Sequence, residues 1–163
     1  MKTLILTLAL SVTALMVSTQ TATAQAESSA IKAVIERETA SFFKHDASAL
    51  IDCWANVPEA TQLYAYSTPE GKQVAGIDAN TKTDLPQRLT ARMTSMDDIS
   101  KAVITRTNYN IRVSGNTAFV TFEQTNNLPD MPTQHLYETR YLEKMGGKWK
   151  LIHVGAIEFK PIN

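Results

Sequence analysis

Three side chains near the C-terminal end of the chain could share one chemical task, namely Glu138, Arg140 and His153. They lie within residues 133–159, where two runs of nearly alternating apolar and polar residues flank a Gly-Gly pair. This pattern predicts a β-hairpin with a two-residue turn of positive φ. In that register Arg140 stands opposite His153. Because side chains alternate across a strand, the three residues and Trp149 then lie on one face.

This face allows two interpretations. In the functional one, Arg140 holds an anionic group such as a carboxylate through a bidentate contact, and His153 relays a proton near neutral pH, with Glu138 beside it. In the structural one, a glutamate neutralises Arg140 and His153 is a hydrogen-bonded core residue, because a buried charge needs a partner whatever the function. The opposite face carries Tyr137, Tyr141 and Ile152 and is apolar for a solvated surface.

The preceding elements must position this hairpin. Helical spacing of apolar residues, or short alternating runs between turn residues, marks each element. We expect helices at 28–44, 47–55 and 77–96, and strands at 61–67, 72–76, 101–113 and 117–125, before the hairpin. Helices segregated from an antiparallel sheet define the α+β class, and strands this long must curl. About three helices on the concave face then produce a cone-shaped fold.

The N-terminus has the composition of a secretory signal peptide. Lys2 provides a positive start, an apolar run follows, and small residues at 22–26 allow cleavage after Ala24 or Ala26. Residues 1–26 are therefore predicted to be a signal peptide and residues 27–163 a single domain. We expect the protein to be exported, to the periplasm or outside the cell, and to have no membrane contact after cleavage.

Composition excludes several classes of protein. Sixteen basic and sixteen acidic residues balance, so a nucleic-acid partner is not expected. The lone Cys53 lies in an apolar helical pattern and is predicted to be a buried thiol. The three histidines are scattered, and no phosphate-cradling glycine loop or nucleophile motif occurs, so we expect neither metal nor cofactor.

The order of elements resembles the nuclear transport factor 2-like superfamily, whose cone fold includes SnoaL-like cyclases, ketosteroid isomerases and the calcium/calmodulin-dependent kinase association domain. The local match is Glu138-Thr139-Arg140, then Gly147-Lys148-Trp149-Lys150, then His153, a pattern similar to that of secreted bacterial SnoaL-like proteins. A second match covers residues 42–50 and resembles the turn between the first two helices of the family. These motifs are specific for fold and weak for function.

The resemblance implies where a site would lie. It places Arg140 inside the cone, adds Glu123 as a second cavity position, and puts Trp54, Tyr64 and Tyr66 near the cavity mouth, where such aromatics can line a pocket or serve as core. It also implies that the outer sheet face, with Tyr137, Tyr141 and Ile152, forms a homodimer. Residues 54–62 depart from the isomerases and cyclases, because they contain no Asp and only one carboxylate, that of Glu59.

The leading hypothesis is therefore an exported SnoaL-like domain that binds a small organic or anionic molecule in its cone. Its ligand contacts would be Arg140, Glu123, Trp54, Tyr64, Tyr66 and Trp149. The alternatives are an enzyme of isomerase, cyclase or hydrolase type that uses His153 with Glu138 or Glu123, and a structural or accessory dimer without catalysis.

Overall fold

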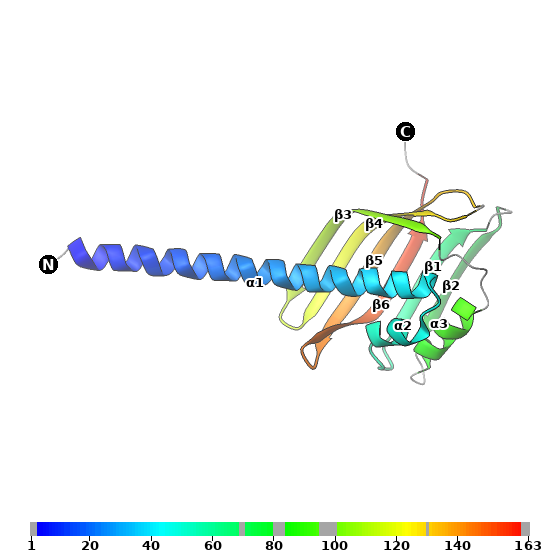
Figure 1. Ribbon diagram of the computed structural model, residues 1–163, viewed down its shortest axis with the longest axis horizontal. Coiled ribbons are helices and arrows are strands. Elements are labelled where there is room, and N and C mark those ends of the chain that lie inside the picture. The colour runs from blue at the N-terminus through cyan, green and yellow to red at the C-terminus, as the bar shows by residue number, and fades with distance from the viewer. Residues whose placement is uncertain (1–2, 69–70, 80–83, 95–100, 130, 161–163) are drawn as a thin grey trace.

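The computed structural model describes residues 3–68, 71–79, 84–94, 101–129 and 131–160. Three helices precede or interrupt the strands of one sheet (Figure 1). The elements are, in chain order, α1 (Thr3–Phe43), α2 (Ala47–Cys53), β1 (Thr61–Ser67), β2 (Gln73–Ala79), α3 (Leu85–Thr94), β3 (Val103–Ser114), β4 (Thr117–Asn127), β5 (Gln134–Met145) and β6 (Lys148–Glu158).

The strands form a six-stranded sheet in the order β2-β1-β6-β5-β4-β3. Every neighbouring pair is antiparallel except β1 and β6, which are parallel. The C-terminal part of α1 crosses one face of the sheet (Figure 1). The helices α2 and α3 lie on the same side of the sheet, near β1 and β2 (Figure 1). The predicted α+β class and cone-shaped fold are confirmed.

The helix α1 is longer than expected, since it begins at Thr3 and continues without a break past Ser28. Ile31 and Ile35 are fully buried and anchor its second half in the core. The structure does not test whether residues 1–26 are removed as a signal peptide. Within the part of the chain that the structure describes, no helix meets the length and hydropathy needed for a membrane span.

Two expectations for the other helices have different outcomes. Asp46 caps α2 as predicted, because its side chain accepts a hydrogen bond from the backbone N–H of Ala49 at 3.0 Å. The prediction of a helix from residue 77 is wrong, since Ile77 pairs with Leu63 in the β1–β2 ladder and α3 begins only at Leu85. Residues 80–83 and 95–96 of that predicted helix lie outside the described residues.

The C-terminal hairpin contains a β-bulge that changes the predicted pairing. Leu142 pairs with Leu151, but Tyr141 pairs with His153, so Ile152 is an extra residue in β6. One inserted residue moves everything beyond it to the other face, because the side-chain period of a strand is two. The predicted pairing of Arg140 with His153 is therefore wrong, and Arg140 pairs with Val154.

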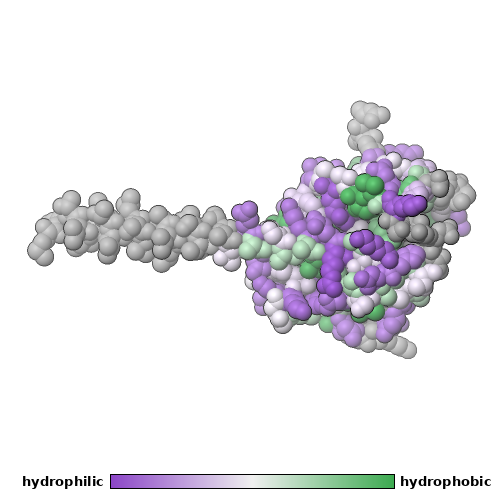
Figure 2. Space-filling model, viewed as in Figure 1, coloured by the Kyte–Doolittle hydropathy of each residue, from purple (hydrophilic) through white to green (hydrophobic). Residues whose placement is uncertain are grey.

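The core lies between the helices and the concave face of the sheet, where Leu50, Phe122, Leu142, Leu151 and Met93 are fully buried. Cys53 is also buried, as predicted, and burial raises the pKa of its thiol to about 11. On the outside, the face that carries α1 is mainly hydrophilic (Figure 2).

Candidate functional site: a cavity with a charged floor inside the cone

The cone contains two adjoining cavities, of about 230 Å³ and about 140 Å³. The larger cavity has an aromatic wall, and the smaller one reaches the charged interior. Their linings have residues in common, so the two spaces adjoin. The shared residues are Phe42, Gln62, Asn126, Leu136 and Ala156.

Aromatic rings form the wall of the larger cavity. Tyr64 and Tyr66 project from β1 with their ring centroids 6.0 Å apart, and Phe42 and Phe43 stand across from them at the end of α1. The guanidinium of Arg92 lies 4.7 Å from the centroid of Tyr64, a cation–π contact that holds this ring. Such a wall suits the apolar body of a small molecule.

The smaller cavity ends at a buried charge cluster. Nη1 of Arg140 donates to Oε2 of Glu138 at 2.6 Å and lies within hydrogen-bond distance of the carbonyl oxygens of Thr139 and Gly155. Nη2 of Arg140 lies 4.0 Å from Oε2 of Glu38, which comes from α1. All three charged side chains are less than a tenth exposed.

Burial sets the protonation preferences of this cluster. It raises the pKa of Glu38; the positive charge of Arg140 opposes this effect, and the negative charge of Glu138 adds to it. Burial acts to lower the pKa of Arg140, but the two carboxylates outweigh it and raise that pKa. Burial therefore favours the neutral form of Glu38, in which a carboxyl group can donate a hydrogen bond.

A chain of amides leads along the concave face into the cavity. Nε2 of Gln124 donates to Oδ1 of Asn126 at 2.9 Å, and Nδ2 of Asn126 lies 3.5 Å from Oε1 of Gln134. This direction leaves Oε1 of Gln124 buried without a hydrogen-bond partner. An unpaired buried acceptor costs free energy, so a group that donates to it would be favoured here.

Two of the predicted residues line the smaller cavity, and two line the larger one. Glu138 and Arg140 face the interior as expected, and Tyr64 and Tyr66 lie at the aromatic wall. Trp54 lies in the hydrophobic core, where it forms a parallel bridge with Leu151. It lines neither cavity.

The bulge and the strand register move two other candidates out of the cone. His153 shares the outer face with Tyr141, and its Nδ1 forms a 2.8 Å hydrogen bond with the hydroxyl of Thr61. Burial, and then the charge of Arg140, lower the pKa of His153. Glu123 pairs with Tyr137, which is 46% exposed, so Glu123 is not the cavity position that the resemblance implied.

Ile152 was predicted to be exposed on the outer face of the sheet, and this prediction is also wrong. It is only 6% exposed, so it is not an exposed member of the outer face with Tyr137 and Tyr141. Trp149 does lie on the inner face, but it is packed under α1 near Glu27, to which its Nε1 donates a hydrogen bond at 2.7 Å. It lines a separate groove and not the cavity of the cone.

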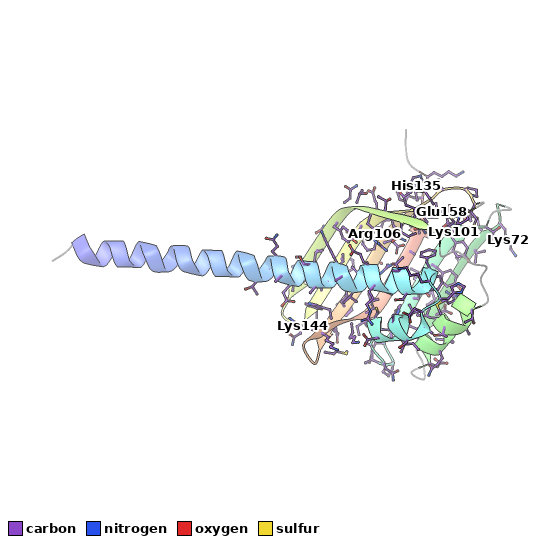
Figure 3. The ribbon with its side chains drawn as sticks, viewed as in Figure 1. Lys72, Lys101, Arg106, His135, Lys144 and Glu158 are labelled. Carbon is purple, nitrogen blue, oxygen red and sulfur yellow. The ribbon has the colours of Figure 1, made fainter. Side chains whose placement is uncertain are left out.

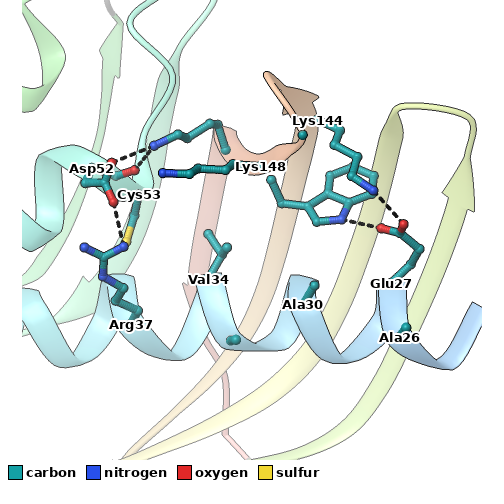
Figure 4. Close-up of a pocket in the computed structure, with 13 residues that line it drawn as sticks. Ala26, Glu27, Ala30, Val34, Arg37, Asp52, Cys53, Lys144 and Lys148 are labelled. Atoms are coloured by element: carbon teal, nitrogen blue, oxygen red, sulfur yellow. Dashed lines mark hydrogen bonds and ion pairs between the residues drawn. The ribbon is translucent and has the colours of Figure 1, made fainter. Parts of the chain in front are cut away.

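That groove, of about 530 Å³, runs between α1 and the hairpin of β5 and β6 (Figure 4). It is lined by several cations, but the structure already pairs most of them. Lys144 bonds to Glu27, and Arg37 and Lys150 both bond to Asp52. Because these charges are satisfied, we place the candidate site inside the cone.

The most important residue that the sequence analysis missed is Glu38. It lies in the stripe of buried positions that Ile31 and Ile35 begin, and a carboxylate in such a stripe is a signal for a buried charge. Gln124 and Asn126 carried a comparable signal, because they continue the inward alternation of Val120 and Phe122. Among the residues that the structure describes, no cluster of His, Cys, Asp or Glu could hold a metal ion.

Comparisons with known proteins agree with this architecture. The sequence matches no protein-family model and no curated protein sequence. Its structure, in contrast, matches solved structures of the nuclear transport factor 2-like superfamily, and the chain has the cone fold of that superfamily.

Three of these solved structures illustrate how similar the matches are to this chain. A protein of unknown function from Pseudomonas putida has 18% sequence identity and a TM-score of 0.61, with 85% of this chain and 89% of that chain covered. A candidate dehydratase from Streptomyces avermitilis has 14% identity and a TM-score of 0.61, with coverage of 84% and 99%. A candidate calcium/calmodulin-dependent protein kinase type II association domain from Thiobacillus denitrificans has 9% identity and a TM-score of 0.57, with coverage of 79% and 94%.

Proposed function

We propose that the protein binds a small organic molecule inside the cone. The apolar body of the ligand would occupy the aromatic cavity between Tyr64 and Phe42, and a polar group would reach the floor near Glu38 and Gln124. The observation that carries this proposal is the shared lining of the two cavities, since an apolar space beside a few convergent polar groups is the usual form of a small-molecule site.

A cavity-filling substitution tests this function. Ala156 lines both cavities, so Ala156→Trp should fill the space, whereas Ala91→Trp places the same side chain at an exposed position on α3. We suggest 2-naphthoate and 2-naphthamide as probes, with binding measured by titration calorimetry and by NMR shifts of cavity residues. Wild type and Ala91→Trp should bind at least one probe, and Ala156→Trp should bind neither. Absence of binding to wild type would contradict the proposal.

A second candidate function is acid–base catalysis at the same site, with Glu38 as the acid in place of His153. The specific observation is a buried carboxyl group, with a pKa raised by burial, that lines a cavity. A neutral Glu38 could donate a hydrogen bond or its proton to the carbonyl oxygen of a bound ketone while a solvent base removes the α-proton, which yields the enol. Deuterium exchange at the α-carbon of 2-tetralone, followed by NMR, tests it. Wild type should accelerate exchange and Glu38→Gln should not; equal rates would remove catalysis of this kind.

We also propose that two copies associate through the outer face of the sheet. Phe119, Tyr137 and Ile157 are each close to half exposed there, on three adjacent strands. Exposed aromatic and aliphatic side chains gathered on a sheet face are typical of an interface between subunits. Export with removal of a signal peptide stays part of the proposal and rests on the N-terminal sequence alone.

A further inference from the structure

Unpaired buried polar atoms gather on the concave face beside the cavity. Seven buried side-chain nitrogen or oxygen atoms lack a hydrogen-bond partner in the described part of the chain, and five of them lie in this one region. They are Nε and Nη2 of Arg106, the hydroxyl of Tyr109, Oε1 of Gln124 and Nε of Arg140. Because buried polar groups are normally paired, such a cluster indicates that a partner binds there.

The strand register places Arg106 beside Gln124, a residue that lines the smaller cavity. Arg106 lies on β3 (Figure 3). It pairs directly with Gln124 on β4, so the two side chains lie next to each other on the concave face. Gln124 lines the cavity. A β-bulge just beyond, between Thr107 and Asn110, turns Tyr109 to the same face, where its ring stacks on Phe122 with centroids 4.9 Å apart.

The charges of this region favour an anion. The guanidinium carbons of Arg106 and Arg140 lie 5.8 Å and 5.3 Å from the ring centroid of the same Phe122, so two like charges flank one ring. Arg140 pairs with Glu138 at 2.6 Å and with Glu38 at 4.0 Å, whereas Arg106 forms no ion pair within the described part of the chain. Burial raises the pKa of Glu38, which weakens the negative charge near the two arginines. Two residues of α1 also face Tyr109. Nζ of Lys32 lies 4.6 Å from the centroid of the Tyr109 ring, and the negative charge of Glu36 raises the pKa of Tyr109. These two charges have opposite signs.

Arg106 is better suited to this task than Arg140 and Arg92, the two arginines that line the cavities. Arg140 already lies between two carboxylates and donates to Glu138 and two carbonyl oxygens. Arg92 forms an ion pair with Asp78 and donates to Gln62. In Arg106, by contrast, Nε and Nη2 are both without a partner, and these two atoms form the edge that matches a carboxylate bidentately.

We propose that Arg106, with the hydroxyl of Tyr109, binds the carboxylate of an amphipathic ligand whose apolar body lies in the cavity of the cone. This inference rests on the proposed function and adds the chemical class of the ligand. A carboxylate between the two guanidinium groups would pair the orphaned nitrogens of Arg106 and reduce the repulsion between the two cations. A group beside the carboxylate that can donate would satisfy Oε1 of Gln124.

Isothermal titration of a matched pair of probes tests the inference on the full chain. 2-Naphthoate and 2-naphthamide have nearly the same shape and differ in charge. Wild type should bind the carboxylate about tenfold or more tightly than the amide, since hydrogen bonds to charged groups are the stronger ones. Arg106→Gln should lose that preference and leave the affinity for the amide within about twofold of wild type, because only the charge-assisted contact is removed.

Two further variants distinguish a lost carboxylate contact from a general loss of folding or charge. Tyr109→Phe retains the stacked ring and should weaken binding of 2-naphthoate alone, even if Arg106→Gln proves poorly folded. Arg112→Gln is the control, because Arg112 is exposed and pairs with Phe119 on the outer face. Equal affinities of wild type for both probes, or a carboxylate preference that survives Arg106→Gln and Tyr109→Phe, would overturn the inference and leave the cavity function intact. Failure of both probes to bind would instead overturn the proposed function.

Discussion

Oε2 of Glu38 lies 4.0 Å from Nη2 of Arg140, while Oε2 of Glu138 lies 2.6 Å from Nη1 of the same guanidinium. One cation from β5 is thus flanked by a carboxylate of its own strand and by one from α1. The two contacts differ in strength, because only the shorter is a hydrogen bond. This asymmetry, together with burial, leaves Glu38 as the weakly paired carboxyl group of the site.

Replacement of Glu38 with Gln should change how stability depends on pH. Burial raises the pKa of Glu38 above its ordinary value of 4.5. The unfolded chain then ionises first, so the free energy of unfolding falls as pH rises from 4.5 to the raised pKa. Glu38→Gln should lack that fall and be more stable than wild type at pH 8. Urea unfolding from pH 4 to 8 measures the difference, and parallel curves for the two proteins would contradict the prediction.

Removal of Arg140 alone should be strongly destabilising. Arg140→Met leaves Glu138 buried at 2% exposure without its cation, and breaking a buried pair in this way costs about 3–5 kcal/mol. The double variant Arg140→Met/Glu138→Leu removes both charges and should recover most of the loss. Chemical denaturation of both variants checks this. A double variant as unstable as the single one would show that packing, and not the unpaired charge, dominates.

Gly155 should not tolerate a side chain. A Cβ atom at this position would lie 2.4 Å from Oγ1 of Thr139, on the paired position of β5. Gly155→Ala should therefore lower the free energy of unfolding by about 1–3 kcal/mol, the usual cost of overpacking. Thr139→Ala in the same chain removes the clashing atom and should restore much of the stability. Thermal unfolding of the two variants is the measurement, and an unaffected Gly155→Ala protein would refute the prediction.

Charge on the outer sheet face should weaken self-association. Tyr137→Glu places a carboxylate among exposed apolar residues, which opposes burial of that face. Sedimentation velocity should show a dimer for wild type and a monomer for this variant. Ile51→Glu is the matched control, since Ile51 is 42% exposed on α2 and should leave the dimer intact. A monomeric wild type would remove the proposed interface.

The residues next to the proposed signal-peptide cleavage site should matter for stability. Glu27 accepts hydrogen bonds from Lys144 at 2.6 Å and from buried Trp149 at 2.7 Å (Figure 4). These bonds lower the pKa of Glu27, so their contribution is present above pH 4.5 and is lost as pH falls through the lowered pKa. A chain that begins at Gln25 should have a higher melting temperature at pH 7 than one that begins at Ser28. Mass spectrometry of the exported protein would locate the cleavage site, which we expect after Ala24 or Ala26.

Local sequence patterns were sufficient for the fold and for part of the site. Alternating residues and the Gly-Gly turn predicted the hairpin and its first paired residues correctly, because turn geometry determines register close to the turn. The inward positions of Glu138 and Arg140 were also correct, since they lie in one unbroken alternation. The resemblance led to the right superfamily fold, but the cavity positions that it implied for Glu123 and Trp54 were wrong.

Only the tertiary structure decided which groups meet at the floor of the cavity. The extra residue Ile152 moves His153 to the outer face. The sequence gives no sign of this bulge, because the strand has apolar residues on both faces whether or not the bulge is present. Glu38 reaches Arg140 across about a hundred residues of chain, and Arg106 reaches Gln124 only through strand pairing. The sequence by itself determined most of the elements and the α+β class, because these depend on local periodicity, although it did not reveal that β2 extends to Ala79. Burial, protonation preference and the unpaired edge of Arg106 depend on which elements pack together, so the three-dimensional structure alone determined them.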